Sequence, residues 1–306
     1  MIDYGLGIDL GATNIKIIAV SAQEQVLRQH TFPTGTDAVS HWGENIRHCI
    51  AEIEKVLGPS TAVGVCCPGL AARDGRSITW MQNRMTSIVG INFTSLLQRH
   101  VPVPVLNDAH AALLGEMWLG AAHGESDVVM LTLGTGVGGA IMSDGRLLKG
   151  RLVRAGHLGH ISLDPAGVKD IAHTPGSLED AIGECTLQRR AGGRYQSTAA
   201  LVQAVVTGDA YARQVWLVSI RALAAGLVSI INAIDPQVIV LGGGITRAGT
   251  ELLSPLRELM DEFEWRPTGE PVRIELARLG DMAGAFGAAH CAMAAITSDT
   301  LNKETS

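Results

Sequence analysis

The 306-residue sequence lacks the features that mark secreted or membrane-spanning proteins. Its five cysteines are odd in number and scattered, with no CxxC pair and no disulfide-like spacing, which favours a reducing cytoplasm. It contains no run of about 18 uninterrupted apolar residues, and it does not start with the basic and apolar regions of a signal peptide. We therefore expect a cytoplasmic protein with no membrane partner.

The sequence also has few aromatic residues and no excess of positive charge. Aromatic residues make up 4%, and 24 basic residues stand against 30 acidic ones, for a net charge of −6. Binding to nucleic acid is therefore not expected, because neither a basic surface nor a stacking platform is indicated. The chain has instead 46% hydrophobic residues and 36 glycines, which suits a well-packed nucleotide-binding α/β protein.

Two strand, glycine turn and strand units stand about 120 residues apart. In the first, apolar runs at 4–10 and 15–20 flank the turn Gly11-Ala12-Thr13-Asn14 and predict a hairpin. In the second, runs at 128–133 and 138–142 flank Gly134-Thr135-Gly136. The repetition predicts an internally duplicated chain of two lobes.

The remaining pattern alternates strands with helices. Further strands are predicted at 26–32, 62–66, 103–106, 238–241 and 272–276, and helices at 39–57, 92–99, 109–119, 209–234, from about 248, and 282–295. We place 1–108 and about 288–306 in a smaller N-terminal lobe and 109–287 in a larger C-terminal lobe. The expected fold class is α/β.

Glycine turns between strands can bind phosphate, because consecutive backbone N–H groups form an anion-binding nest and a threonine hydroxyl adds a donor. A single turn of this kind is more often an ordinary hairpin. Here two such turns occur together with a third glycine cluster, Gly242-Gly243-Gly244, after a buried strand. The set indicates a split ATP site.

The residues of these turns resemble a known family. The strings IDLGATNIK, LTLGTGVGGAI and VIVLGGGI look like the two phosphate motifs and the adenosine motif of the actin, hexokinase and heat-shock ATPase superfamily. NDAHAALLGE, AGHLGH and LGDMAGAFGAA narrow the resemblance to sugar kinases of the ROK (repressor, open reading frame, kinase) family. The resemblance implies a two-lobed, ribonuclease H-like fold with the active site in the interlobe cleft.

The resemblance also implies a role for each matching residue. Asp9 would hold the Mg²⁺ of MgATP through water, and Asp108 would be the general base that accepts a proton from the sugar hydroxyl. ATP would contact Gly11, Thr13, Asn14, Gly134, Thr135, Gly136, Gly242, Gly243 and Gly244. The sugar would contact Gly69, Asn107, Asp108, His157, His160 and Glu179. Since Asp108 precedes a predicted helix, its alternative role is that of a helix N-cap.

The chain departs from the family pattern at its metal site. Where the resemblance predicts three zinc-binding cysteines, the sequence has Asp170, Ala172 and Ser177, while Glu179 stands at its expected spacing. Structural zinc requires four ligands, mostly thiolates, so we expect the zinc site to be lost. A replacement metal site that uses His157, His160, His173 and Asp170 is the less favoured alternative.

His157 also stands where the family has a sugar-binding glutamate, so the acceptor sugar can differ from plain glucose or an N-acetylhexosamine. Asn83 and Asn92 are weaker sugar-binding candidates, with a turn or a helix cap as the favoured interpretation. Lys16 could assist a phosphate or be a solvated lysine at a strand end. Cys66 and Cys67 are expected to be buried free thiols.

The leading hypothesis is an ATP-dependent sugar kinase that transfers the γ-phosphoryl group to a hydroxyl of a hexose or hexose-like substrate and forms a homodimer. The alternative is a catalytically weak sugar sensor of the same family. Repressor relatives carry a helix-turn-helix before the first phosphate motif, whereas six residues precede Gly7 here. An actin-like or chaperone ATPase is a third hypothesis, disfavoured by the sugar-type NDAH and GHLGH segments.

Overall fold

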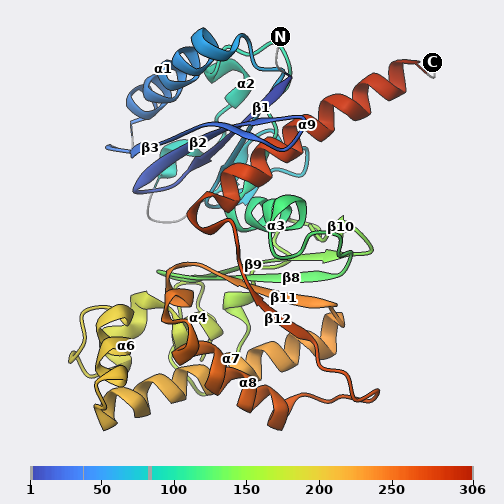
Figure 1. Cartoon of the computed structure of the whole chain (residues 1–306). Helices are drawn as coiled ribbons and strands as arrows, with labels where there is room; N and C mark the ends of the chain where they lie inside the picture. The colour runs from blue at the N-terminus through green and yellow to red at the C-terminus, as the bar shows by residue number, and fades with distance from the viewer. Residues whose placement is uncertain (1–2, 37, 82–84, 305–306) are drawn as a thin grey trace. The chain divides into compact units, whose positions relative to one another are not determined.

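The computed structural model describes residues 3–36, 38–81 and 85–304, with side chains described up to residue 296. The chain forms two compact units. Unit 1 comprises Met1–Gly124, Lys149–Arg154 and Arg278–Ser306, and unit 2 comprises Glu125–Leu148 and Ala155–Ala277. Each unit is built around a five-stranded sheet (Figure 1).

The sheet of unit 1 has the strand order β3-β2-β1-β4-β7. Its strands are β1 (Tyr4–Leu10), β2 (Asn14–Ser21), β3 (Val26–Pro33), β4 (Ala62–Cys67) and β7 (Val105–Asn107), and a small second sheet pairs β5 (Leu70–Ala71) with β6 (Ile78–Trp80). The predicted hairpin forms, because β1 pairs antiparallel with β2. β1, β4 and β7 run parallel to one another, so their carboxyl ends share one edge of the sheet.

The helices of unit 1 are α1 (Val39–Leu57), α2 (Phe93–Leu96), α3 (Asp108–Leu119) and α9 (Ala283–Glu304), with 3₁₀ turns at Thr86–Ile88 and Gly280–Met282. The large apolar residues Tyr4, Leu6, Ile8 and Leu10 of β1 share a buried cluster with Trp42 and other residues of α1. The glycines between them allow the backbone of α9 to approach, since a Cβ on Gly7 would lie 1.8 Å from the Ala285 carbonyl oxygen. The period of two in β1 therefore separates a side-chain interface from a backbone interface.

The sheet of unit 2 has the order β10-β9-β8-β11-β12 (Figure 1). Its strands are β8 (Val128–Leu133), β9 (Val137–Ser143), β10 (Arg146–Leu147), β11 (Val238–Gly242) and β12 (Arg273–Leu276). Its helices are α4 (Leu178–Ile182), α5 (Leu187–Arg190), α6 (Thr198–Val206), α7 (Ala210–Ile234) and α8 (Thr250–Phe263), with 3₁₀ turns at Leu158–His160, Glu184–Thr186 and Gly244–Ala248. β8 pairs antiparallel with β9 and parallel with β11, so the second predicted hairpin also forms.

Helix α7 is the one helix among the described residues that is long and apolar enough to cross a membrane. It packs against α4, α6 and α8, and Trp216, Ile220, Leu223 and Leu227 on its inner face are buried in the main core of unit 2. A core helix of a soluble protein passes the same length and composition test, so this finding alone is weak evidence for a membrane span.

The division of the chain differs from the predicted lobes at three places. Unit 1 includes residues 109–124 with helix α3, Lys149–Arg154 and residues 278–287, whereas the sequence predicts 109–287 in the larger lobe. For the first and last of these segments the reason is packing between α3 and α9: a Cβ on Gly287 would lie 1.7 Å from the carbonyl oxygen of Ala111. Glu116 of α3 also accepts hydrogen bonds from the backbone N–H groups of Arg278 (3.0 Å) and Leu279 (2.8 Å).

Candidate active site

The shared edge of the parallel strands in unit 1 brings together residues that are far apart in sequence. Asp9 lies in register with Cys66 of β4, and Cys67 lies in register with Asn107 of β7. Asp108 follows directly as the first residue of α3. The two carboxylates that the sequence singled out therefore stand at one edge of one sheet.

Asp9 is a largely buried carboxylate, with 16% of its side chain exposed. Burial raises its pKa from 3.8 to about 6; Lys16 lowers the pKa, and the nearby Asp108 carboxylate raises it. Lys16 Nζ lies 3.4 Å from Asp9 Oδ2, and the Cys66 thiol donates to Asp9 Oδ1 over 3.7 Å. Among the described residues, the Asp9 side chain thus has two partners, both weak, and a largely buried anion of this kind is suited to attract a cation.

Asp108 is exposed, and the N-cap of α3 is Asn107 rather than Asp108. The Asn107 side chain accepts from the N–H groups of Ala109 (3.0 Å) and His110 (3.2 Å). Asp108 Oδ1 accepts from the N–H of Ala109 at 2.9 Å, which fixes the carboxylate against the first turn and leaves Oδ2 for another donor. The N-cap interpretation of Asp108 is therefore wrong, because its neighbour performs that role.

Gly69 lies beside Asn107, as a shared sugar subsite requires. Asn107 Nδ2 donates to the Gly69 carbonyl oxygen over 3.0 Å. Gly69 has a φ of +101°, and a Cβ at this position would lie 2.5 Å from the Trp80 carbonyl oxygen. Only glycine fits this conformation and this close approach.

The turn of the first hairpin is fixed by Thr34, the residue that follows β3. Gly11 N–H donates to the Asn14 carbonyl oxygen (3.0 Å), and the buried Thr34 hydroxyl donates to the Gly11 carbonyl oxygen (2.6 Å). Thr13 and Asn14 are exposed. Sequence patterning missed Thr34, because the contact spans 23 residues and no local motif marks it.

The second glycine turn, in unit 2, is fixed by residues 183–186. Gly134 N–H donates to the Gly136 carbonyl oxygen over 2.9 Å, which closes the turn. The carbonyl oxygens of Gly134 and Thr135 accept from the N–H groups of Glu184 (3.0 Å) and Cys185 (2.9 Å). With its carbonyl groups paired inward, the turn keeps Thr135 exposed.

Glu179 contacts the phosphate-type turn directly. Glu179 Oε2 accepts from the Val137 N–H over 2.9 Å, and a Cβ on Gly136 would lie 2.3 Å from the same oxygen. The glycine at 136 therefore makes room for a carboxylate of its own unit. Glu179, a predicted sugar-binding residue, therefore contacts Gly136, a predicted nucleotide-binding residue.

His160 is held by Asp170. Its Nδ1 lies 2.7 Å from Asp170 Oδ2, and 29% of the His160 side chain is exposed against 3% for Asp170. Burial raises the pKa of Asp170, but hydrogen bonds from His160, Ser177 and Thr174 outweigh it and hold the pKa below its usual range. The sequence marked Asp170 as a missing cysteine and, with His160, as a candidate ligand of a replacement metal site, but did not predict a hydrogen bond between the two side chains.

The residues of the family's metal position do not fit zinc. Ligand atoms of His160, Asp170 and Glu179 lie within 4.8 Å of one another, which is the geometry of a possible metal cluster. However, Asp170 is already bonded to His160, Glu179 to the Val137 N–H, and no thiol belongs to the cluster. Structural zinc prefers four tetrahedral ligands rich in thiolate, and this donor set offers one imidazole and two engaged carboxylates.

The glycine triplet begins at Gly242, the last residue of β11, which lies in register with Thr132 near the end of β8. Gly243 has a φ of +89°, and its Cβ would lie 2.3 Å from the Leu133 carbonyl oxygen. A Cβ on Gly244 would meet nothing within 4 Å. The need for glycine at 243 therefore comes from packing against β8, and 244 borders open space.

The other candidates are placed as follows. His157 is half-buried and precedes the 3₁₀ turn Leu158–His160, in a segment that packs against β9. Asn92 caps α2 through a 3.1 Å hydrogen bond from the Ser95 N–H, as the cap interpretation predicts. Asn83 lies outside the described residues. Cys66 and Cys67 are buried free thiols, as expected.

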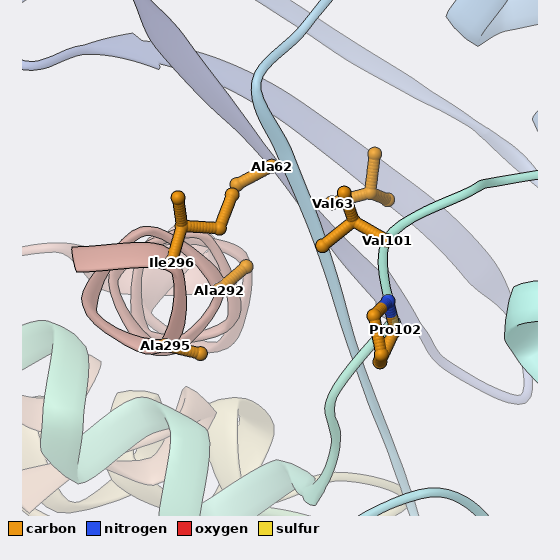
Figure 2. A pocket seen from close by; sticks show the side chains of 7 residues that line it. All are labelled: Ala62, Val63, Val101, Pro102, Ala292, Ala295 and Ile296. Carbon is orange, nitrogen blue, oxygen red and sulfur yellow. The ribbon is translucent and has the colours of Figure 1, made fainter. Parts of the chain in front are cut away.

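Unit 1 also contains a small apolar cavity of about 50 Å³, away from these residues (Figure 2). It is lined by Ala62, Val63, Val101, Pro102, Ala292, Ala295 and Ile296. None of the predicted site residues lines it, and its size and apolar side chains do not suit a sugar or a nucleotide.

Known proteins of similar sequence and structure cover nearly the whole chain. The ROK family model matches residues 5–295. Glucokinase from Thermotoga maritima is 31% identical over 93% of this chain and 95% of its own length. Among solved structures, the ROK hexokinase from Thermus thermophilus is 30% identical with a TM-score of 0.80, covering 96% of this chain and 99% of that one.

A ROK family glucokinase from Streptomyces griseus, solved in complex with glucose and AMPPNP, is 26% identical with a TM-score of 0.78. The match covers 95% of this chain and 99% of that one. The strand order, the two glycine turns and the carboxylates at the edge of the first sheet are thus accompanied by similarity over the full length of the domain pair. The chain belongs to the ROK family.

Proposed function

We propose that this ATP-dependent sugar kinase uses Asp108 as its general base and transfers the γ-phosphoryl group of ATP to a hydroxyl of a hexose or hexose-like substrate. The kinase activity itself follows from the family and from its glucokinase relatives. The role of Asp108 rests on one observation: its carboxylate is exposed beside Asp9 at the edge where β1, β4 and β7 end.

The chemistry needs few groups. As the sugar oxygen attacks phosphorus, its proton passes to a base, and Asp108 has one oxygen fixed by the Ala109 N–H and a second available to accept that proton. Phosphoryl transfer otherwise depends on alignment and on neutralising charge. Asn107 supports the base by capping α3 and by anchoring Gly69, so the sugar-binding backbone and the base share one support.

We propose that Asp9 holds Mg²⁺. Carboxylate oxygens are the ligands that this cation prefers, and Asp9 is a poorly compensated buried anion. When bound, Mg²⁺ would neutralise charge on the ATP phosphates. Lys16, 3.4 Å from Asp9, is placed to keep this carboxylate ionised before the cation arrives.

In unit 2, we propose that Thr135 and the backbone of its turn bind ATP phosphates, and that His157, His160 and Glu179 bind the sugar. The 2.9 Å hydrogen bond from the Val137 N–H to Glu179 would couple the position of this sugar-binding side chain to that of the phosphate-binding turn. The proposal keeps the predictions of a cytoplasmic location and a homodimer.

The test is a coupled ADP-release assay with MgATP and a panel of hexoses, N-acetylhexosamines and polyols. We expect sugar-dependent release that D108N lowers by at least about 100-fold, since a positioned base contributes about 10² to 10⁴. The matched control is D74N, which changes another exposed aspartate of unit 1 that forms an ordinary Asx turn with Arg76. D74N should keep wild-type turnover.

Retention of most activity by D108N would refute the role of Asp108. A wild-type protein that binds sugar in calorimetry but releases no ADP with any of these sugars would instead favour the sensor hypothesis. The observation that supports this alternative is His157 in place of the family's glutamate.

A further inference from the structure

The three positions at which the family resemblance predicts zinc-binding cysteines come together with His160 around a single carboxylate in this chain, that of Asp170. His160 Nδ1 lies 2.7 Å from Asp170 Oδ2. At the second expected cysteine, the Ala172 N–H donates to Asp170 Oδ1 over 2.9 Å. At the third, the Ser177 side chain is hydrogen-bonded to Asp170. The first expected cysteine is Asp170 itself.

Asp170 uses both of its oxygens and is nearly inaccessible. Oδ1 accepts from Ala172 and also from the Thr174 N–H (2.9 Å), while Oδ2 accepts from His160. The side chain is 3% exposed. These donors hold its pKa below the usual range, so the group is an anion at neutral pH, and an ionised carboxylate can only accept hydrogen bonds.

This arrangement determines the state of the His160 ring. Because Asp170 accepts, Nδ1 of His160 must carry a proton, and in the neutral imidazole Nε2 is then left as an acceptor. A metal ion bound at Nδ1 would require the opposite, an unprotonated nitrogen. The hydrogen bond from His160 Nδ1 to Asp170 and a metal ion at this nitrogen are therefore mutually exclusive.

The same carboxylate connects the loop to the helix that carries Glu179. The Ser177 hydroxyl oxygen caps α4 by accepting from the Asp180 N–H over 3.2 Å, while the hydroxyl group also bonds Asp170. Glu179 is the second residue of that helix. Asp170 thus supports two predicted sugar ligands: His160 directly, and Glu179 through Ser177.

We propose that Asp170 replaces the structural metal of this loop: its carboxylate organises residues 164–177 and acts as a positioning residue that holds His160 with Nδ1 protonated. The loop part of the proposal is independent of catalysis, whereas its effect on sugar binding rests on the proposed function.

The test compares D170N with D164N. Asparagine at 170 has one acceptor oxygen and can serve His160 or the backbone donors of Ala172 and Thr174, but not both. Asp164 lies in the same loop and makes the same kind of turn, accepting from the Ala166 N–H over 2.9 Å, without touching His160. D164N is therefore the matched control.

The first readout is ¹⁵N NMR of protein labelled at histidine, with the His160 signals assigned from their absence in H160Q. In the wild type and in D164N we expect neutral His160 to be protonated at Nδ1, and in D170N we expect a mixture of tautomers. Wild-type His160 protonated at Nε2 would overturn the proposal, even if D170N failed to fold.

The second readout is the metal content of the purified wild-type protein and its thermal unfolding with and without EDTA. We expect substoichiometric zinc and an unchanged Tm. One tightly held zinc per chain, with a lower Tm in EDTA, would overturn the replacement of the metal. Hydrogen exchange of 161–177 should be faster in D170N than in D164N, and equal rates would refute the role of Asp170 in the loop.

The third readout is kinetic. For D170N we expect the KM for the sugar to rise about tenfold or more, the range typical for loss of a supporting partner, with a much smaller change in kcat and in the KM for ATP. In the H160Q background, D170N should have little further effect on the KM for the sugar. If the wild type phosphorylates no sugar, the proposed function fails, while the tautomer, metal and exchange measurements still decide the role of Asp170.

Discussion

Replacing Asp9 by asparagine (D9N) is expected to stabilise unit 1 while it removes the proposed magnesium ligand. Burial raises the pKa of Asp9 from 3.8 to about 6, so the folded protein at neutral pH contains a carboxylate that ionises at a cost. At about 1.4 kcal/mol for each pH unit between the two values, this cost is about 3 kcal/mol. Asparagine has nearly the same shape and no charge.

The direction of the pH dependence of stability follows from proton binding at Asp9. Between about pH 4 and pH 6 the folded state binds a proton at Asp9 that the unfolded state has already lost, so the stability that comes from protonation disappears as the pH rises through 6. The advantage of D9N over the wild type should therefore grow from about half of its full value at pH 5 to about 3 kcal/mol at pH 8.

The assay is urea unfolding at pH 5, 6, 7 and 8, without nucleotide or divalent cation, because a bound cation would compensate the charge. Since the chain has two compact units, hydrogen exchange of β1 and β4 should accompany the urea measurement to locate the change in unit 1. Exposed Asp74 provides the control, and D74N should follow the wild type at every pH.

A D9N protein that is no more stable than the wild type at pH 8, or whose advantage does not grow with pH, would refute the reasoning. The weak contacts to Lys16 (3.4 Å) and Cys66 (3.7 Å) would then contribute more than the burial of the charge costs. In the wild type, kcat/KM for ATP should also fall below about pH 6, as Asp9 becomes protonated.

Two further variants test packing. G243A should lower the free energy of unfolding by more than about 2 kcal/mol, because Gly243 has a positive φ and its Cβ would lie 2.3 Å from a Leu133 backbone oxygen. Urea unfolding compares this loss with that of the control G244A, where a Cβ meets nothing within 4 Å. Equal losses in the two variants would contradict the prediction. E116Q should lower the free energy of unfolding by about 2 to 3 kcal/mol in the same assay. The buried Glu116 carboxylate accepts from the backbone N–H groups of Ala121, Arg278 and Leu279, whereas glutamine has one acceptor oxygen. A change below about 0.5 kcal/mol would be contrary evidence.

The sequence predicted most of the helices and strands and the class of kinase, because both depend on short local sequence patterns. The two apolar runs that flank the Gly11 turn, the helical period of α1 and the strand that ends before Asp108 each appear within one short window. The prediction of an ATP-dependent sugar kinase of the ROK family is confirmed. The individual site residues, Mg²⁺, the location and the homodimer stay predictions.

What sequence patterning missed depends on contacts between distant segments. Helices α4, α5 and α6 were not predicted, because segments of 5, 4 and 9 residues show little helical period. The position of α3 with α9 depends on glycine contacts that no single helix reveals. The sequence marked Asp170 as an absent cysteine and as a candidate ligand of a less favoured replacement metal site. Its role emerges once His160, Ala172 and Ser177 are seen to converge on it.

The close contact of α9 with β1 and β4 has a consequence for biosynthesis. β1 leaves the ribosome long before α9, the helix that lies beside its sheet (Figure 1). The glycine face of this sheet is shaped to receive α9, because a Cβ on Gly7 or Gly64 would lie 1.8 or 2.0 Å from the Ala285 or Ala288 carbonyl oxygen. Until then one side of the sheet lacks its cover, whereas the residues of unit 2 have all been synthesised. We therefore expect unit 2 to fold first on the nascent chain and the N-terminal sheet to remain dependent on chaperones until α9 emerges.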